Sequence, residues 1–542
     1  MTLKESLLKV GYLPENLPPT FTTDALGGFL AAKKGWISKK PVRAANYNAS
    51  KRGMTRRTFS LLHPQTAHDL AAFIDLHADA FTEFFARSPF SLSAPRLMED
   101  GDRAVQIASH SELEAARLAK LAPFRFIAKT DISRFYHSIY THSVPWAFHG
   151  KAAAKADRRA ASEATFMNRL DAVLCSGQDG QTIGIPVGPD ASRYVAELVG
   201  TAIDLEFVAR GGAENCEVIR HVDDVWIGAH THADAEAALW KYREAIRSYE
   251  LDINESKTLI TSEQFQFSDV WPSDISTRIE FAINSPSKRV PDRLRAALEY
   301  AFSLAAKDGD DGILKYTLRY LDRSELADEH WEHIEPFLKR AAVHFGHTVD
   351  YVARIVVWRH LARRDLEIAE WTPIIVNLLL RHGRLGNDGE VCWALYVALR
   401  LRIPVPLEVA RSIVTNCGAL STVSLLSMAE FGLVDAAIFS FAENAIITET
   451  ASGAYWPIFL EWQAKDWPEG VFMVSDNPLI EEIAGSKISI FDATQLPAVF
   501  DDFDEEDFGS VGHAIETRTS QYDDDDDDED EAQEEEDDDL DF

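Results

Sequence analysis

The chain has 542 residues, 46% of them hydrophobic, and a formal net charge of −33. This length and apolar content exclude a wholly disordered chain and predict two or three folded domains. No apolar run reaches about 18 residues, so we expect no membrane span. The start of the chain, residues 1–6, lacks a signal-peptide pattern, which favours a cytoplasmic protein.

The first 120 residues are expected to form one N-terminal unit with a locally basic region. Its cations are Lys33, Lys34, Lys39, Lys40, Arg43, Lys51, Arg52, Arg56 and Arg57. A nucleic-acid channel needs only local positive charge, so the acidic net charge of the whole chain does not exclude one. A solvated basic surface is the alternative reading.

A strand with a carboxylate at its end is predicted over residues 124–131. Alternation places Phe124, Phe126 and Ala128 on one face, and Arg125, Ile127, Lys129 and Asp131 on the other. The second face thus carries cations beside Asp131, where a phosphate would lie. Apolar residues at 132, 135, 136 and 139 predict that a helix begins at once.

A glycine-bounded turn follows at residues 184–192, Gly-Ile-Pro-Val-Gly-Pro-Asp-Ala-Ser. Gly184 and Gly188 allow the backbone to approach a ligand closely. Pro189 suits the first turn of a helix, whose N-terminus favours anions. Alone, such a turn is more often structural than functional.

A tight hairpin with two aspartates at its tip is predicted over residues 218–227, Val-Ile-Arg-His-Val-Asp-Asp-Val-Trp-Ile. Nucleotidyl transfer uses two Mg²⁺ ions about 3.5–4 Å apart, and Mg²⁺ prefers carboxylate oxygens. Because neighbouring strand residues point to opposite faces, we assign Asp131 and Asp223 as the bridging pair and Asp224 as an auxiliary acid.

Residues 291–499 are predicted to form an all-α domain. Helical patterns occur at 293–304, 352–362, 371–380, 390–399, 407–415 and 421–431. Short turns between them suggest HEAT-like paired repeats. Such a domain is expected to line a nucleic-acid channel and to support homo-oligomers.

The end of the chain, residues 500–542, is predicted to be a disordered acidic tail. Residues 523–542 contain 16 acids and no bases. The tail could mimic nucleic acid, bind a basic partner or simply increase solubility. The four cysteines, Cys175, Cys216, Cys392 and Cys417, lack paired metal spacing, and we expect buried free thiols.

The three segments around Asp131, Gly184–Ser192 and Asp223–Asp224 resemble motifs A, B and C of reverse transcriptases. Leu251–Thr258 resembles motif D, and Lys51–Phe59 resembles the fingers hairpin. The stretches 135–151 and 181–192 are similar to bacterial antiviral reverse transcriptases of the abortive-infection and unknown-group lineages. The resemblance covers roughly residues 40–290 and implies a right-hand polymerase with an α+β palm (121–290) and fingers.

The resemblance also implies roles for individual residues. The metal ligands would be Asp131, Asp223 and Asp224, together with Ile132. Tyr136 would be the steric gate that favours dNTPs, and Lys257 would protonate the pyrophosphate. Arg56 or Arg57 would hold the triphosphate; the wider nucleotide-binding set is Arg56, Arg57, Lys129, Tyr136, Pro186 and Gly188.

Two departures from the family pattern bear on the activity. His221 stands where most relatives have Tyr or Phe, and Val187 stands where many have Gln. Both favour unusual priming or a short or repetitive product. One alternative is therefore a template-independent or protein-primed nucleotidyl transferase. Others are a non-catalytic nucleic-acid-binding module and a maturase or retron-type enzyme.

The implied function is an RNA-directed DNA polymerase in bacterial antiphage defence. Its cofactor would be Mg²⁺ (two ions), with Mn²⁺ as a substitute. Its partners would be dNTPs, an RNA template and the DNA product, and relatives also use a non-coding RNA or a second reverse transcriptase.

Overall fold

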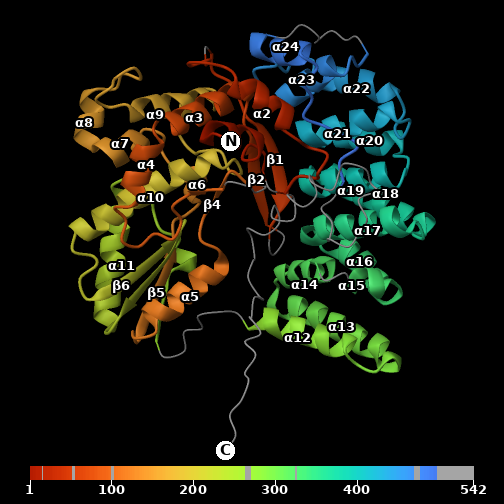
Figure 1. Cartoon of the computed structure of the whole chain (residues 1–542), viewed down its shortest axis with the longest axis horizontal. Helices are drawn as coiled ribbons and strands as arrows, with labels where there is room; N and C mark the ends of the chain where they lie inside the picture. Colours follow the sequence, from red (N-terminus) through yellow and green to blue (C-terminus); the bar gives the residue numbers. More distant parts are fainter. Residues whose placement is uncertain are drawn as a thin grey trace, which may run out of the picture.

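The computed structural model describes residues 1–496, except 15, 39, 52–54, 99–102, 263–269, 324–325 and 469–475. Figure 1 shows two lobes with the N-terminal elements between them. We call residues 64–262 the sheet lobe and residues 271–496 the helical lobe. The predicted acidic tail (500–542), together with Lys39 and Arg52 of the basic region, lies outside the described residues.

The N-terminal elements and the sheet lobe contain all the strands of the described residues. Their helices are α1 (Leu3–Lys9), α2 (Asp24–Ala31), α3 (Pro64–Leu76), α4 (Ala78–Phe85), α5 (His110–Leu121), α6 (Phe135–Ser138), α7 (Ser143–His149), α8 (Lys151–Ala156), α9 (Met167–Ser176), α10 (Ala191–Ala209) and α11 (His232–Arg247). The strands are β1 (Ala45–Ser50), β2 (Arg56–Leu61), β3 (Arg96–Leu97), β4 (Val105–Gln106), β5 (Phe126–Asp131), β6 (Cys216–His221), β7 (Asp224–Ala229) and β8 (Leu259–Ser262). The short 3₁₀ helix η1 (Glu255–Lys257) precedes β8.

The main sheet is antiparallel, with the strand order β6-β7-β5-β8. Its central strand β5 lies between β7 and β8, which come about 100 residues later in the chain. Asp131, at the end of β5, is in register with Asp224 at the start of β7. This topology therefore brings the two predicted carboxylate segments together at one end of the sheet.

Both faces of the sheet are packed, although one predicted face of β5 carries Arg125 and Lys129. On one face, Phe126 and Ala128 join the main core with α10 and α11. On the other, Ile127, Ile219 and Trp226 form a small second core with apolar residues of α5. The alternating pattern did not predict that α5 packs on this face. A strand face that carries both charged and apolar residues can be either exposed to solvent or packed against another element.

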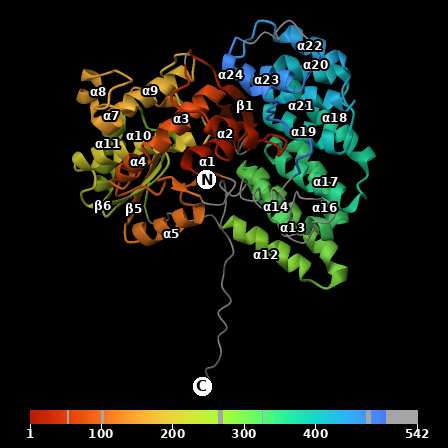
Figure 2. The ribbon, with the colours of Figure 1, turned by 45° about the horizontal axis from the view of Figure 1, so that its top comes forward.

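The helical lobe contains the rest of the chain. Its helices are α12 (Trp271–Ile283), α13 (Val290–Asp308), α14 (Gly312–Arg323), α15 (Leu326–Glu329), α16 (Trp331–His344), α17 (Val349–Arg363), α18 (Ile368–Leu385), α19 (Asp388–Arg400), α20 (Leu407–Asn416), α21 (Ala419–Glu430), α22 (Ala437–Ala445), α23 (Trp456–Ala464) and α24 (Pro478–Gly485), with the short 3₁₀ helices η2 (Ser287–Arg289) and η3 (Gly346–Thr348). Figure 2 shows them as one stack from α12 to α24.

The stack has two layers over much of its length. Helices α17, α19, α21 and α23 each pack on the next member of that series, and α16, α18, α20 and α22 do the same. The helix α19 is buried along almost its whole length, whereas α18 buries one face. A helix that is apolar all round belongs inside a fold, and an amphipathic one at its surface. The structure has a helix at each of the six stretches predicted between 293 and 431, so these predictions are confirmed. That the helices form HEAT-like repeats is not confirmed.

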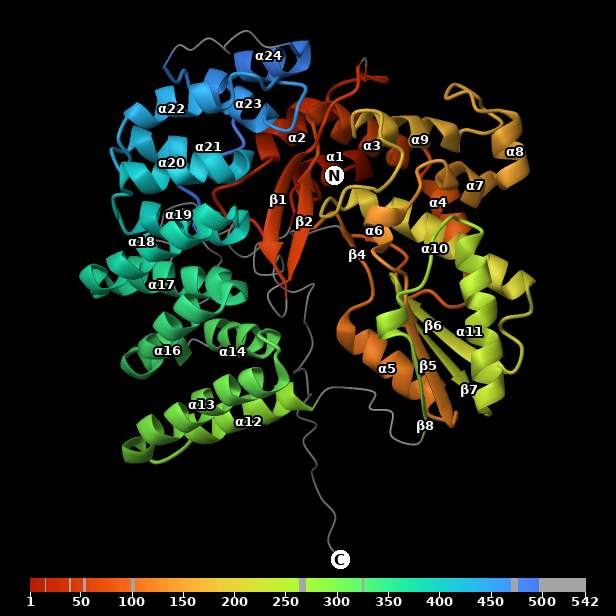
Figure 3. The same cartoon turned by 180° about the vertical axis from the view of Figure 1, so that it is seen from behind.

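The β1–β2 hairpin joins the two lobes. It lies between them in Figure 3, and β1 packs against α19 and α21. A Cβ at Gly389, on α19, would lie 3.1 Å from the Cα of Ala49, so the helix and strand approach closely. The Asn48 side chain donates to the carbonyl of Gly386 at 2.7 Å and to Asp388 at 2.8 Å. The hairpin is therefore held by the helical lobe.

Two local predictions differ from the structure. The helix after Asp131 begins only at Phe135, because Arg134 has a left-handed backbone with φ of +48°. The helix α12 lies inside the segment predicted as palm, but it packs on α13 and α14. Within the described residues, no helix combines the length and apolarity needed to cross a bilayer.

Candidate functional site

Three carboxylates gather at one end of the main sheet. Asp131 ends β5, and Val222 and Asp223 form the two-residue turn between β6 and β7 that leads into Asp224. The N–H of Ile132 donates to the carbonyl of Asp223 at 3.2 Å, which ties the end of β5 to the turn. The structure therefore brings together the three acids that the sequence predicted, with Asp224 directly opposite Asp131.

The turn itself has an unusual backbone. Val222 has φ of +54°, a conformation that costs a β-branched residue on the order of 1–3 kcal/mol. Two contacts hold it: the Val222 N–H donates to Ser93 Oγ at 2.5 Å, and its carbonyl accepts from Arg220 Nη1 at 3.2 Å. The surroundings thus fix the position of Asp223 and Asp224.

A buried ion network supports the turn from beneath. Arg220 is fully buried and pairs with Glu197 and Asp204 of α10, each at 2.9 Å. Ser91 and Ser88 donate to these two acids at 2.7 and 2.6 Å. Removing one partner of such a network leaves a buried charge, which costs about 3–5 kcal/mol. Sequence reasoning missed this network; its signal was Glu197 and Asp204, two of the three acids in a largely apolar helix.

Burial and mutual repulsion perturb the carboxylates. Burial first, and then the charge of Asp224, raises the pKa of Asp223 to about 6. Burial also raises the pKa of Asp224, while Lys129 and Lys257 act in the opposite direction. Crowded acids with raised pKa values mark a functional site or a cation site. They would gain from a bound cation that offsets their repulsion.

The donor set suits a hard divalent cation. The Asp131 Oδ1 atom is buried and accepts no hydrogen bond from the part of the chain that the structure describes. An unpartnered buried carboxylate oxygen is costly, and a metal ion would satisfy it. Three carboxylates without a thiol or imidazole match Mg²⁺ or Mn²⁺ rather than Zn²⁺. The predicted fourth ligand, Ile132, follows Asp131 directly and its side chain is fully buried.

Lys257 contacts Asp131 through an ion pair. Its segment is fixed to β5: the Asn254 N–H donates to the Asp131 carbonyl at 2.8 Å, and the hydroxyls of Thr130 and Thr258 lie 2.8 Å apart. The hydrogen bond to Asp131 raises the pKa of Lys257. The lysine implied by the resemblance therefore lies at the carboxylates as a protonated group.

The basic hairpin supplies further positive charge to this end of the sheet. Burial lowers the pKa of Lys51, as do the charges of Arg57 and Lys257, whereas Asp223 and Asp131 raise it. Lys51 therefore lies within electrostatic reach of the carboxylates, and Arg57 lies within reach of Lys51. We call Lys51, Arg57 and Lys257 the cation group.

Arg56 points elsewhere. Its guanidinium donates to both carboxylate oxygens of Glu390 at 2.7 and 2.8 Å. Since neighbouring strand residues point to opposite faces, Arg57 is directed away from this pair, and its side chain is exposed. Of the two arginines that the sequence left open, Arg56 is thus engaged by Glu390 of the helical lobe, whereas Arg57 lies within reach of Lys51. Lys33 and Arg43 of the basic region also pair with acids, Glu482 and Asp179.

The glycine turn packs between the hairpin and α6. The Ile185 N–H donates to the Tyr136 carbonyl at 2.7 Å, and the Ser60 N–H of β2 donates to the Val187 carbonyl at 2.8 Å. Gly188 has φ of +113°, and a Cβ there would lie 3.0 Å from Pro14. This position therefore needs glycine, because of its left-handed backbone and the close side chain of Pro14.

Two predicted nucleotide-binding residues flank this turn. Pro186 is buried within it. Tyr136 is half-buried and lines a small pocket with Arg193, Glu197 and Val222, so it lies beside the carboxylate turn.

Lys129 and His221 occupy the sheet just below the carboxylates. Lys129 Nζ lies 5.6 Å from the ring centroid of Trp226, with which it is paired across the strands. The His221 ring contacts the Ala108 carbonyl through Nε2 at 2.8 Å, and burial lowers its pKa to about 4. His221 is therefore a neutral side chain that ties the hairpin to the segment before α5.

A scan of protein-family models finds no match, and a search of curated proteins finds none either. Among solved structures, the chain is similar to a telomerase from Candida albicans in complex with a fragment of telomeric RNA. The identity is 10%, the TM-score is 0.29, and the match covers 62% of this chain and 64% of that one. A similarity of this extent carries no argument about activity, so the function is argued from the site.

Proposed function

We propose that this chain is an RNA-directed DNA polymerase, a nucleotidyl transferase that adds dNTPs by metal-dependent catalysis. One observation carries the proposal: Asp131, Asp223 and Asp224 converge at one end of the main sheet, where Lys257 pairs with Asp131 and Lys51 lies within electrostatic reach. Acids that hold divalent ions, opposite cations that hold a triphosphate, are what nucleotidyl transfer requires. The sequence resemblance to reverse transcriptases supports the same activity.

The carboxylates fit Mg²⁺ because they form an all-oxygen set and leave Asp131 Oδ1 without a hydrogen bond from the described residues. Asp131, Asp223 and Asp224, with the backbone of Ile132, would hold two ions. When bound, these ions supply activation of a 3′-hydroxyl and charge neutralisation of the triphosphate.

The protein's own side chains then orient the nucleotide. Arg57 and Lys51 hold the triphosphate, since a guanidinium matches phosphate oxygens with two donors. Lys129 adds positive charge below Asp224. Tyr136 lies beside the turn, where its ring would exclude a ribose 2′-hydroxyl. Lys257 donates a proton to the departing pyrophosphate.

The wider assignment follows from the same proposal. The sheet lobe would be a polymerase palm, the β1–β2 hairpin its fingers, and the helical lobe a HEAT-like wall for an RNA template and its DNA product. Antiphage defence in a bacterial cytoplasm, and a non-coding RNA or second reverse transcriptase as partner, rest on the sequence resemblance. Plaque counts in cells that carry the wild type or the Asp223→Asn variant test that role.

Nucleotide incorporation by the purified full chain tests the activity. Each dNTP and NTP is supplied singly and mixed, with Mg²⁺ or Mn²⁺, before and after RNase removes co-purifying RNA. Asp223→Asn is the inactive variant. Asp292→Asn is the matched control, because its side chain is 83% exposed and lies in the helical lobe.

Incorporation of dNTPs that is lost in Asp223→Asn and after RNase, but kept in Asp292→Asn, supports RNA-directed synthesis. Incorporation that survives RNase favours template-independent or protein-primed extension. Absence of incorporation in every condition, with RNA bound to the folded protein, contradicts the proposal and favours a non-catalytic binding module.

A further inference from the structure

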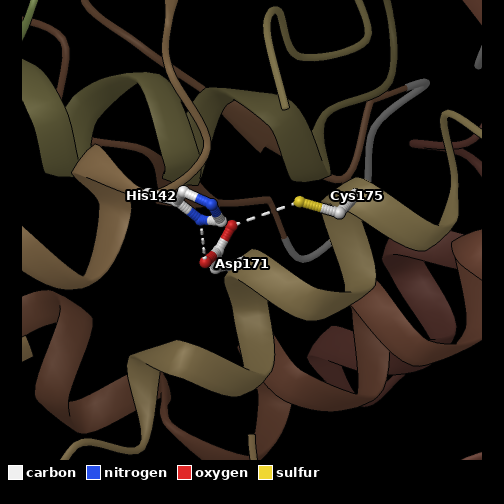
Figure 4. A group of neighbouring side chains, drawn as sticks. All are labelled: His142, Asp171 and Cys175. Carbon is white, nitrogen blue, oxygen red and sulfur yellow. Dashed lines mark hydrogen bonds and ion pairs between the residues drawn. The ribbon is translucent and has the colours of Figure 1, made fainter. Parts of the chain in front are cut away.

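A second group of metal-ligating side chains lies outside the carboxylate cluster. Figure 4 shows His142, Asp171 and Cys175 turned toward one another. His142 Nδ1 lies 2.6 Å from Asp171 Oδ2, and the Cys175 thiol donates to Asp171 Oδ1 at 3.3 Å. One ligand atom from each residue can be chosen so that all three lie within 4.8 Å of one another.

Local structure explains why the three meet. Asp171 and Cys175 are four residues apart on α9, so they occupy the same helix face. His142 is the residue directly before α7, which packs on α9. The spacing of the cysteines did not predict this group. The group combines one Asp-x-x-x-Cys pair on a helix with a histidine from a distant part of the sequence, and such a combination has no characteristic spacing.

The surroundings hold the group in place. The buried Thr141 hydroxyl lies 3.0 Å from Cys175 Sγ. The Thr141 N–H donates to the Thr182 carbonyl at 2.8 Å, and the Gly180 N–H donates to the Cys175 carbonyl at 2.8 Å. Contacts of this kind beyond the ligands orient them and tune a metal site. They also connect the group to the segment that leads into the glycine turn.

The arrangement does not suit a nucleophilic cysteine. In a Cys-His pair the imidazole activates the thiol, but here the carboxylate lies between the two. Burial, with the Asp171 charge acting in the same direction, raises the pKa of Cys175 to about 12. A thiol that is protonated at neutral pH is a poor nucleophile, although a bound metal ion can displace its proton.

We propose that His142, Asp171 and Cys175 bind a Zn²⁺ ion. One nitrogen, one oxygen and one sulfur donor are the ligand types that Zn²⁺ takes, at distances of about 2.0–2.3 Å. A tetrahedral ion with such bonds separates its ligand atoms by about 3.5 Å, so side-chain shifts of about 1 Å suffice. Three protein ligands leave the fourth position to water.

This site is independent of the proposed polymerase activity. Its thiol and imidazole favour Zn²⁺ over the Mg²⁺ that suits the all-carboxylate cluster. The ion would join α7 to α9 and so stabilise the sheet lobe.

Titration of the full chain with Co²⁺ and Zn²⁺ tests the proposal. The protein is first stripped with a chelator and kept reduced. Co²⁺ should produce the near-ultraviolet absorption of a cobalt–thiolate bond at one equivalent, and Zn²⁺ should remove it by displacement. Cys175→Ser should abolish this absorption and weaken Zn²⁺ binding at least 100-fold against a chelating dye. Asp171→Asn and His142→Gln should weaken it at least tenfold.

Cys216→Ser is the matched control, because Cys216 is also a half-buried free thiol of the sheet lobe. It should bind both ions as the wild type does. Circular dichroism identifies any variant that fails to fold, and only folded variants are compared. Absence of cobalt–thiolate absorption in the folded wild type would overturn the proposal, as would equal Zn²⁺ affinity of Cys175→Ser and wild type.

Discussion

Arg56 on β2 forms a two-point ion pair with Glu390 on α19, although 334 residues separate them in the chain. Glu390 is almost fully buried, with 3% of its side chain exposed, and Arg56 is 28% exposed. The pair fixes the hairpin to the helical lobe and so sets the direction of the next residue, Arg57. The helical lobe thereby influences the position of Arg57, a member of the cation group, although the lobe itself supplies none of the carboxylates.

Arg56→Gln should destabilise the protein by about 2–3 kcal/mol, since it leaves a buried carboxylate without its cation. The urea midpoint of unfolding measures the change. The double variant Arg56→Gln/Glu390→Gln should recover part of the loss, because two neutral amides can hydrogen-bond each other. Arg57→Gln is the matched control and should unfold as the wild type does. Equal midpoints for all variants would show that the pair contributes nothing.

Arg57→Ala should instead affect nucleotide binding. The side chain is exposed and lies within reach of Lys51, so its removal should leave the melting temperature unchanged. Loss of a charge-assisted contact to phosphate, worth about 1.5–3 kcal/mol, should raise KM for dNTPs about 10- to 100-fold. Steady-state incorporation kinetics give this value. Arg87→Ala, an exposed arginine stacked on Phe84, should leave KM unchanged; an equal change in both variants would contradict the assignment of Arg57.

The meeting of Asp131, Asp223 and Asp224 at one end of the sheet shows how much of the site could be predicted from the sequence. Chain order and strand periodicity predicted that Asp131, Asp223 and Asp224 lie together, because short motifs with local rules determine each segment. Lys257 was implied only by the resemblance of its segment to a known motif. The choice between Arg56 and Arg57 could not be made, since it depends on Glu390, a residue remote in sequence.

The support for the Asp223 turn was also beyond the sequence. Arg220 pairs with two acids on α10, 16 and 23 residues away. Ionic residues in apolar elements show that a buried pair exists but not which charges meet, because long-range packing decides the partners. The cover that α5 provides for the second sheet face was missed for the same reason.

Asp223 should make stability depend on pH. Its pKa of about 6 in the folded protein lies above the ordinary value of 3.8, so the folded state holds the proton more tightly. The tighter proton binding by Asp223 therefore adds to the free energy of unfolding. This contribution is fully present below about pH 4, the pKa of the unfolded chain, and is lost as the pH rises through 6, the pKa of the folded protein. Asp223→Asn removes the penalty and should be about 1–2 kcal/mol more stable than wild type at pH 7.5, but not at pH 4.

Thermal melting across this pH range checks the difference between variant and wild type. Millimolar Mg²⁺ should raise the melting temperature of the wild type at pH 7.5 more than that of Asp223→Asn, because binding to the folded state adds stability. Asp292→Asn should follow the wild type throughout. A constant difference between Asp223→Asn and wild type from pH 4 to 7.5 would contradict the role of this carboxylate.

Lys257→Met should slow catalysis while leaving nucleotide affinity nearly intact. The ammonium of Lys257 pairs with Asp131, and that hydrogen bond raises its pKa, so the group carries its proton at neutral pH. A positioned general acid contributes about 10²–10⁴-fold to a rate, and kcat should fall at least 100-fold with KM changed less than threefold. Single-turnover incorporation separates the chemical step from product release. Lys120→Met is the matched control, because Lys120 forms an exposed ion pair with Glu217 at 3.5 Å. A rise in KM with kcat unchanged would assign Lys257 to binding the triphosphate and would contradict its role as the acid.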